Sequence, residues 1–453
     1  MKILSAKHKW VGESDLRLDA SYHLSEGRLH KKIIEKAPFG NLNLKDVTSA
    51  IYNGARFKRY YVNDPSKGIP FMGSSDMLKS DLNSLKFLSK KLSKNIEQFR
   101  LVEGWILVSC SGTIGNTVFT NKDFEDKAAS QHIMRIIPNN NVKEGFLYAF
   151  LSSKYGYSLL TQGTYGAVIQ HIEPHHIENL PIPILPEPKQ QEIHKLIIEA
   201  SNLRVEANKL LREAIEFFES IIGESKVHLG FQTGKISSKS LNSYHKRLDS
   251  QFQLLWYDLE SEEEEIIKHE KIYEYAKSIF VGGRGKRNYM EKGVAFLSSS
   301  DMMLFNPKRG CKYVSKNNPG LDSMMVNKKD ILISRSGTVG NTVLVGEDLE
   351  GTAISEHALR LIIDSDKISP NYVFCFLKTK YGMKSMEASS FGSVIITLNE
   401  DLIGNINMPL LDQESQDKIN ELIETYLVKM DEATKKENQA IDLVEKEIES
   451  WQK

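Results

Sequence analysis

The sequence contains few cysteines and no long hydrophobic stretch. Its 453 residues include three cysteines, Cys110, Cys311 and Cys375, and no two of them lie close together. This scatter argues against a disulfide framework or a zinc ribbon and favours a reducing, cytoplasmic location. No apolar run approaches the roughly 18 residues of a transmembrane helix, and the first ten residues lack the apolar core of a signal peptide. We therefore expect no membrane partner.

The sequence also lacks net charge, because 59 lysine and arginine residues balance 59 aspartate and glutamate residues. Taken as a whole, this balance counts against a nucleic-acid partner. The charge is unevenly distributed, however. Residues 1–185 carry 24 basic and 17 acidic side chains and residues 226–411 carry 24 and 22, whereas residues 186–225 carry 5 and 8 and residues 412–453 carry 6 and 12. The positive excess therefore lies in two large segments, and the negative excess lies in the segments that follow them.

Motifs for nucleotide chemistry are missing as well. The sequence has no Walker motif, no glycine-rich cofactor loop that opens a βαβ unit, no amino-methyltransferase motif and no convincing cluster of nuclease carboxylates. The segment VGGRGKR at 281–287 resembles a phosphate-binding loop only superficially. These absences argue against a protein that is an enzyme by itself.

The most informative feature is an internal repeat. ILVSCSGTIGNTVFT at 106–120 matches ILISRSGTVGNTVLV at 331–345, and ten of the fifteen positions are identical. Other segments pair at nearly the same offset: 17–24 with 247–254, 68–78 with 293–303, 128–137 with 353–362, 146–156 with 372–382, and 165–185 with 391–411. Two copies of one module predict two similar domains.

A charged segment after each module predicts a long helix. In the first segment, apolar or small residues alternate in steps of three and four along Ile193, Leu196, Ala200, Leu203, Ala207, Leu210, Ala214, Phe217 and Ile221. The second segment has a weaker series, Ile423, Leu427, Met430, Thr434, Glu437, Ile441, Val444, Ile448 and Trp451. This spacing is typical of a coiled coil, so we expect the two helices to pair. The alternative is two independent amphipathic helices, each packed on its own domain.

The expected architecture is therefore α+β. We predict two tandem mixed modules, each followed by a long helix, with boundaries at 1–185, 186–225, 226–411 and 412–453. Within the modules, β-branched runs such as 106–110 predict short strands, and glycine-rich loops separate them.

Both modules carry a basic cluster beside glycine. The first contains Arg56, Lys58, Arg59 and Tyr60, and the second contains Arg284, Lys286, Arg287 and Asn288. Arginine and lysine supply phosphate contacts, and arginine also forms paired hydrogen bonds with guanine. Glycine lets a backbone approach a ligand closely. We predict DNA contact here; the alternative is an ordinary solvated loop.

Two further glycine-containing segments recur. Ser111 to Asn116 and Ser336 to Asn341 share the pattern SGTxGN, which lacks the lysine and the spacing of a phosphate-binding loop. We favour a tight turn between two strands, with glycines at positive φ and asparagine capping the turn, over direct DNA contact. The loops with Gln162, Thr164 and Tyr165 in one copy and Ser390 in the other have an exposed, polar and aromatic character. They are candidates for reading bases or for plain packing.

The histidines favour structural roles. His132 and His357 occupy matched positions, and no acid or nucleophile is identifiable as a catalytic partner, so we expect buried, hydrogen-bonded side chains. His171, His175 and His176 resemble a metal cluster, but the second copy does not repeat them. We therefore expect neither catalytic residues nor a metal site, and twin active sites remain only an alternative.

The chain resembles the specificity subunit of type I restriction–modification systems. The resemblance rests on a module with a central SGTxGN turn, an ending of the form xxLPIPxLPxxxQxEI and a long heptad helix, all repeated once. The first copy carries the ending in residues 179–193, whereas the second, in residues 405–419, keeps one proline and Gln416. This departure leaves the start of the second helix less certain.

The resemblance implies two target-recognition domains held apart by an antiparallel pair of helices, each domain reading half of a split DNA site. It implies double-stranded DNA, two methyltransferase subunits and a restriction and translocation subunit as partners. No cofactor would be bound by this chain, since S-adenosylmethionine, ATP and magnesium would lie on the partners.

Helix length would then set the spacing of the two half-sites. A helix of about 35 residues is about 50 Å long, compared with about 34 Å for one turn of DNA. Deleting one heptad from both helices should therefore change the spacer. Two alternatives stay open: the recognition subunit of a fused methyltransferase–nuclease system, and a stand-alone coiled-coil DNA-binding regulator.

Overall fold

The chain divides into two compact units, and both long helices cross the division. Unit 1 comprises residues 1–205 with 432–453, and unit 2 comprises residues 206–431. The computed structural model describes residues 12, 20–23, 25–93, 96–162, 171–223, 267–336, 339–392 and 396–452. Each unit thus contains one module and part of each helix, whereas the sequence suggested boundaries between the modules and the helices.

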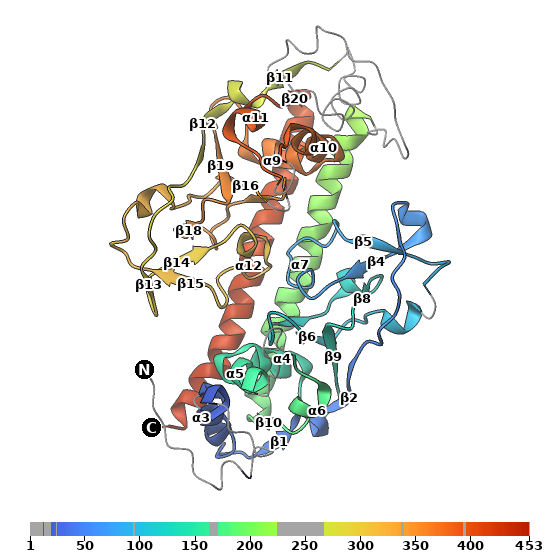
Figure 1. Ribbon diagram of the computed structural model, residues 1–453, viewed down its shortest axis with the longest axis vertical. Helices are drawn as coiled ribbons and strands as arrows, with labels where there is room; N and C mark the ends of the chain where they lie inside the picture. The colour runs from blue at the N-terminus through green and yellow to red at the C-terminus, as the bar shows by residue number, and fades with distance from the viewer. Residues whose placement is uncertain are drawn as a thin grey trace. The chain divides into compact units, whose positions relative to one another are not determined.

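Unit 1 contains two four-stranded sheets and one two-stranded sheet (Figure 1). The first sheet has the order β2 (Thr48–Asn53), β9 (Ile133–Pro138), β6 (Ile106–Ser109) and β7 (Thr117–Phe119), and all its pairs are antiparallel. The second has the order β3 (Tyr61–Val62), β5 (Lys86–Ser89), β4 (Gly68–Met72) and β8 (Ala128–Ala129), with β4 and β8 parallel. The third pairs β1 (Asn41–Asn43) with β10 (Pro181–Pro183).

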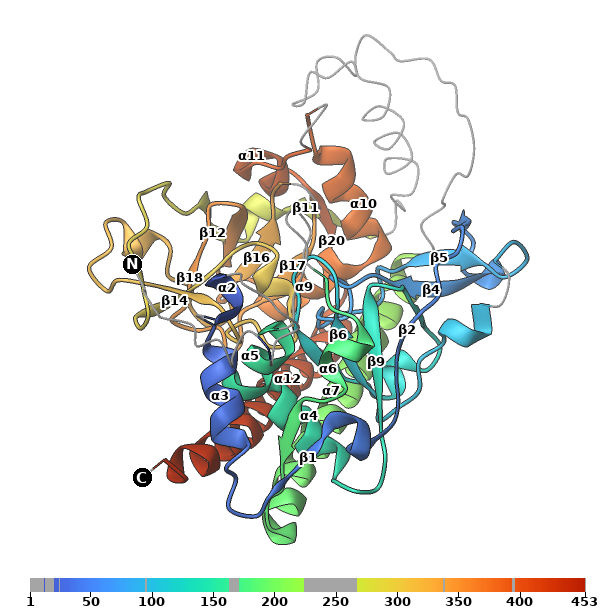
Figure 2. The ribbon, with the colours of Figure 1, turned by 60° about the horizontal axis from the view of Figure 1, so that its bottom comes forward.

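The helices of unit 1 surround an apolar core. They are α2 (Ala20–His23), α3 (Glu26–Ile34), α4 (Glu144–Ser152), α5 (Lys154–Gln162), α6 (Pro174–Ile177) and the long α7 (Glu187–Ile222). Helix α3 packs along α5 (Figure 2). Nearly every residue of α4 is buried. The core around α4 includes side chains of α7 (Ile193, Ile197) and of the chain's last helix (Val444, Ile448).

Unit 2 repeats this architecture. Its first sheet has the order β12 (Ala276–Val281), β19 (Ala358–Ile363), β16 (Ile331–Ser334) and β17 (Thr342–Leu344). Its second sheet has the order β13 (Tyr289–Met290), β15 (Lys312–Val314), β14 (Val294–Leu297) and β18 (Ala353–Ile354). The third pairs β11 (His269–Lys271) with β20 (Asn407–Pro409). Its helices are α9 (Pro370–Lys378), α10 (Lys380–Ser389), α11 (Glu400–Gly404) and α12 (Gln413–Ser450). The predicted α+β fold, with two tandem modules each followed by a long helix, is confirmed.

A buried arginine joins the two larger sheets within each unit. Arg135 of β9 and Arg360 of β19 are almost fully buried. Arg135 donates to the carbonyl oxygens of Ala129, Ser130 and Ile133. Arg360 donates to those of Ser323, Met324, Met325 and Ile354. Burial lowers the pKa of both guanidinium groups to about 10, so both stay charged at neutral pH and form strong charge-assisted hydrogen bonds.

The two long helices pair in both units, and they run antiparallel. In unit 1, Lys189 of α7 contacts Glu447 of α12, and Glu199 contacts Lys436 at 2.9 Å. In unit 2, Glu206 contacts Lys429 at 2.6 Å, and the Lys418 ammonium lies 3.8 Å from the ring centre of Phe217. Partner numbers on α12 fall as those on α7 rise, which is the signature of an antiparallel pair.

The predicted contact positions are buried on α12, whereas most of those on α7 are only half-buried. On α12, Leu427, Ile441 and Val444 are buried. On α7, Ile193 is buried, but four predicted positions, Leu196, Leu203, Leu210 and Phe217, are only half-buried. Their neighbours Ile197, Leu211 and Phe218 are buried instead. The reason is that α7 also packs against the modules: the ring centre of Phe218 lies 5.1 Å from that of Tyr372 in the core of unit 2.

Each module also docks onto the helix that follows the other module. In unit 1, the backbone N–H of Lys154, at the start of α5, donates to Glu445 of α12 at 2.7 Å. In unit 2, the N–H of Lys380, at the start of α10, donates to Glu219 of α7 at 2.7 Å. The two contacts are equivalent positions of the repeat, so both helices belong to both docking surfaces.

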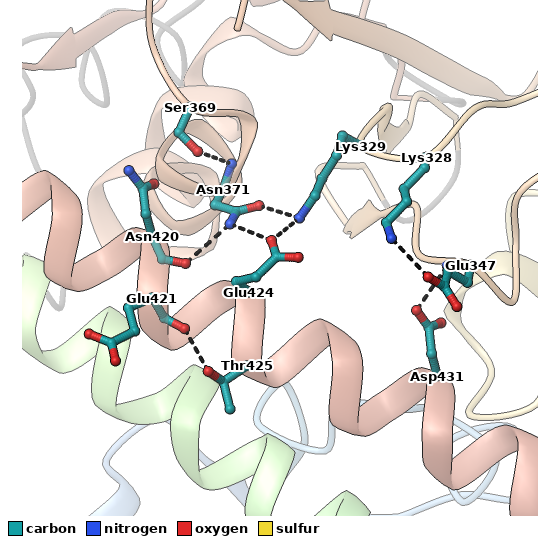
Figure 3. Close-up of polar contacts among 10 residues, drawn as sticks. All are labelled: Lys328, Lys329, Glu347, Ser369, Asn371, Asn420, Glu421, Glu424, Thr425 and Asp431. Carbon is teal, nitrogen blue, oxygen red and sulfur yellow. Dashed lines mark hydrogen bonds and ion pairs between the residues drawn. The ribbon is translucent and has the colours of Figure 1, made fainter.

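In unit 2, the side chain of Lys329 connects the module to α12 (Figure 3), and its backbone is strained. Its ammonium contacts Glu424 and donates to Asn371 Oδ1 at 2.9 Å. It has a φ of 73°, whereas the matched residue of the first module is Gly104 with a φ of 83°. Among the described residues, Lys329 is the only non-glycine residue with positive φ. A non-glycine residue in this region costs on the order of 1 kcal/mol.

Exchanging Lys329 for glycine or alanine should distinguish the energetic cost of its strained backbone from the stabilisation by its ammonium contacts. Lys329→Ala removes the ammonium and keeps the strain, so we expect a loss of about 1 kcal/mol. Lys329→Gly removes both, and its unfolding free energy should exceed that of the alanine variant by about 1 kcal/mol. Chemical denaturation of both variants measures this difference. If the glycine variant were no more stable than the alanine variant, the backbone strain assigned to residue 329 would be contradicted.

No helix in the described part of the chain is long and apolar enough to cross a membrane.

Candidate nucleic-acid interface

The two basic clusters link one sheet to the next. Residues 54–60 connect β2 to β3, and residues 282–288 connect β12 to β13. A Cβ atom on Gly54 would lie 3.0 Å from Nη1 of the buried Arg135. A Cβ atom on Gly282 would lie 3.3 Å from Nη2 of Arg360. These two glycines therefore leave room for a buried arginine beside each cluster.

In unit 1, the basic cluster combines exposed cations with a fixed one. Arg56 and Lys58 are exposed, and the Lys58 ammonium lies 5.1 Å from the ring centre of Tyr60. Arg59 is half-buried: its guanidinium lies 5.0 Å from the ring centre of Phe71 and donates to Gln131 Oε1 at 2.7 Å. Stacking on an aromatic ring holds the guanidinium plane in place.

Unit 2 has the same arrangement with one change of charge. Arg284, Lys286 and Asn288 are exposed. The Arg287 guanidinium lies 4.8 Å from the ring centre of Phe296, as Arg59 lies over Phe71. Its polar partner is the carboxylate of Glu356, which replaces Gln131 of the first module.

The SGTxGN segments close hairpins, which agrees with the structural interpretation. Gly112 and Gly115 have φ values of 79° and 86° between β6 and β7, and Gly340 has a φ of 86° before β17. The turn is closed by the preceding serine rather than by asparagine. Ser109 donates its hydroxyl to the Thr113 carbonyl at 2.6 Å, and the same oxygen accepts from the N–H of Asn116 at 3.1 Å.

The hairpin turn of unit 1 brings separate candidate segments together. Cys110 donates its N–H to the His132 carbonyl at 3.0 Å, and Ile172 donates to the Cys110 carbonyl at 3.1 Å. Ser111 forms an isolated β-bridge with His171. In unit 2, Ser336 pairs with Thr397 in the same way. The turn thus lies beside the segment that contains the histidine and the segment that follows the polar loop.

The expectation of buried histidines was wrong. His132 is half-buried, and the side chain of His357 is 54% exposed. The pKa of His132 is lowered, first by burial and then by the nearby charges of Arg59, His171 and Arg56. A lowered pKa means that His132 resists protonation, chiefly because it is partly buried and also because Arg59, His171 and Arg56 lie nearby. Unit 1 therefore gathers basic side chains from three segments at this place.

The polar loops are less exposed than the sequence suggested. Gln162 and Ser390 are both 9% exposed. Gln162 ends α5, on the side packed by α3, and Ser390 donates its hydroxyl to the Glu387 carbonyl at the end of α10. Both residues are thus part of helix ends, and the prediction of an exposed position for them was wrong. Thr164 and Tyr165 lie outside the described residues.

The predicted DNA-contact residues left out one tyrosine at the end of each cluster. Tyr61 is 48% exposed and Tyr289 is 49% exposed, each at the start of a matched strand. The Lys86 ammonium lies 5.8 Å from the ring of Tyr61, and that of Lys312 lies 5.2 Å from the ring of Tyr289. Both copies read Arg-x-Lys-Arg-x-Tyr, so these two tyrosines occupy matched positions of the repeat.

Two of the three histidines that resemble a metal cluster, His175 and His176, lie in the short helix α6. His176 Nδ1 accepts from the N–H of Glu173 at 2.9 Å at the start of α6, and its ring packs against that of His175. Within the described ranges, no group of three or more histidine, cysteine, aspartate or glutamate residues could hold a metal ion.

Comparison with known families agrees with the repeat. The model of the type I restriction modification DNA specificity domain matches residues 38–216 and 260–443. The chain belongs to this family. Its two modules are thus DNA specificity domains of type I restriction–modification systems, and sequence-specific DNA recognition is their function.

Individual relatives are distant. The chain is 22% identical over 359 residues to the type I restriction enzyme MjaVIII specificity subunit of Methanocaldococcus jannaschii, with 76% of this chain and 77% of that protein covered. The S subunit of a type I system from M. genitalium is 14% identical, with 92% and 96% covered and a TM-score of 0.36. The HsdS subunit of Thermoanaerobacter tengcongensis is 14% identical, with 92% and 98% covered and a TM-score of 0.29.

Proposed function

We propose that this chain directs a methyltransferase and a restriction subunit to a bipartite DNA site and performs no chemistry itself. The observation that carries the proposal is the recurrence of one basic face in two DNA specificity domains. Arg59 over Phe71 in one module and Arg287 over Phe296 in the other place a stacked guanidinium at equivalent positions. Exposed arginine and lysine residues beside each of them suit contacts to DNA phosphates.

Each module would read one half-site. The frameworks agree in strand order, while the clusters differ at Tyr60 and Asn288 and in the loops before β10 and β20. Shared framework with different side chains suits two domains that read different sequences. The DNA site would then be split and asymmetric.

The partners and cofactors follow from this proposal. Two methyltransferase subunits would dock on the chain, and a restriction and translocation subunit would complete the complex. S-adenosylmethionine, ATP and magnesium would be bound by those partners and not by this chain. The proposed location is the cytoplasm, where the three free cysteines would remain reduced.

Methylation mapping tests the proposal. Single-molecule sequencing of the host genome should reveal a bipartite methylated motif that disappears when this gene is deleted and returns when it is restored. A motif that persists in the deletion strain would refute the assignment. Affinity purification from the host should also recover a methyltransferase subunit; a chain recovered alone would favour a stand-alone DNA-binding regulator.

A further inference from the structure

Two matched arginines differ in one neighbouring side chain, which is neutral in the first module and negatively charged in the second. Arg59 and Arg287 each lie over a phenylalanine ring, at 5.0 and 4.8 Å from its centre. Each is held by the residue that precedes the matched histidine. That residue is Gln131 in the first module and Glu356 in the second.

In the first module, a neutral amide holds the arginine. Gln131 Oε1 accepts from Arg59 at 2.7 Å, and Gln131 Nε2 lies 3.0 Å from Nε2 of His132. Both ends of the amide therefore contact other side chains of the module, and the amide carries no charge. The guanidinium has five N–H donors and keeps its full positive charge.

In the second module, a carboxylate neutralises the arginine. The Arg287 side chain is 25% exposed and that of Glu356 is 13% exposed, so solvent screens this pair only partly. Glu356 also lies 3.9 Å from Nε2 of His357. A phosphate group that approached Arg287 would meet a pair with no net charge. Such a contact releases few counterions and adds little to the salt-dependent part of binding.

We propose that residues 131 and 356 set how much arginine charge each module presents to the DNA backbone, so that Arg59 is a full phosphate contact and Arg287 a neutralised one. This inference rests on the proposed DNA-recognition function. It makes the two modules electrostatically unequal although their frameworks are alike. Gln131 and Glu356 act through the arginines, so they are positioning residues that set affinity.

Two nearly isosteric exchanges in the full chain, assembled with its methyltransferase partner, test the inference. For Glu356→Gln, the log–log slope of affinity against salt on the cognate DNA should become steeper by about one, with affinity about tenfold higher at physiological salt. For Gln131→Glu, the slope should become shallower by about one and affinity should fall about tenfold. Phosphate contacts are independent of sequence, so the methylated motif should stay the same in both variants.

Matched charge changes on the same modules serve as controls. Glu350→Gln and Gln98→Glu alter exposed residues by the same charge and should shift the slope much less. Equal slopes for site and control variants would overturn the inference, as would an altered methylated motif, which would make these residues base readers. Wild-type protein that fails to bind its cognate DNA specifically would instead refute the proposed function.

Discussion

Replacing Glu437 with alanine should lower the unfolding free energy by about 3–5 kcal/mol, as is usual when one partner of a buried ion pair is removed. The Glu437 side chain is fully buried in α12. It accepts a hydrogen bond from Arg204 of α7 at 2.5 Å and another from the hydroxyl of Tyr148 in α4. Alanine would leave the Arg204 guanidinium, whose side chain is 14% exposed, without its carboxylate in a largely dry environment.

A double variant distinguishes charge from packing. Arg204→Met with Glu437→Leu replaces the pair by apolar side chains, and it should recover most of the lost free energy. Glu432→Ala serves as the matched control, because its side chain is 49% exposed on the same helix and pairs only at the surface, at 3.5 Å from Lys436. Chemical denaturation measures all three. An alanine variant of Glu437 as stable as that of Glu432 would contradict a buried, energetically coupled pair.

Lengthening both helices by one heptad should lengthen the DNA spacer by about three base pairs, since seven helical residues add about 10 Å and one base pair occupies about 3.4 Å. Duplication is preferable to deletion because it keeps Arg204, which pairs with Glu437, and Asp431, which accepts hydrogen bonds from the N–H groups of Glu347 and Asp348. The ion pairs Glu199–Lys436 and Glu206–Lys429 are seven residues apart on both helices. Duplicating residues 200–206 and 430–436 therefore preserves the pattern of paired charges.

A duplication in one helix only serves as the control for the double duplication. Duplicating residues in one helix only would shift the pairing register, and we expect such a protein to assemble poorly and to methylate neither the old nor the new motif. Single-molecule sequencing of the host genome reads the spacer directly. An unchanged spacer in a folded double duplication would refute helix length as the determinant of half-site spacing.

The sequence predicted the fold well because the repeat was visible in it. Segments 106–120 and 331–345 occupy matched hairpins, and α7 and α12 end within three residues of the expected bounds. The weaker series on the second helix, which has the polar residues Thr434 and Glu437 in its middle, correctly marked a buried face. Both residues are at most 4% exposed. Periodicity could reveal this face because its buried side chains recur at the same spacing, although they contact both α7 and α4.

The candidate site was predicted less completely, and the reasons are physical. Leu210 and Phe217 follow a heptad, but a heptad describes one partner helix, whereas α7 also packs on module cores through Leu211 and Phe218. Gln162 has a loop-like sequence around it, yet it falls on the last turn of α5, where α3 covers it. Contacts such as Arg59 with Gln131 join residues far apart in the chain, and no local pattern encodes them.

The shared use of the helices has a consequence for the order in which the protein can fold during synthesis. Unit 2 is one continuous stretch of chain, residues 206–431, although it holds the second module. Unit 1 includes the first module but also needs Val444 and Ile448 from the last helix for its core. The first module must therefore wait until α12 has been synthesised before its core is complete, and its apolar docking face stays uncovered until then. Removing the last turns of α12 would damage the first module, although the second module lies much closer to them in the sequence.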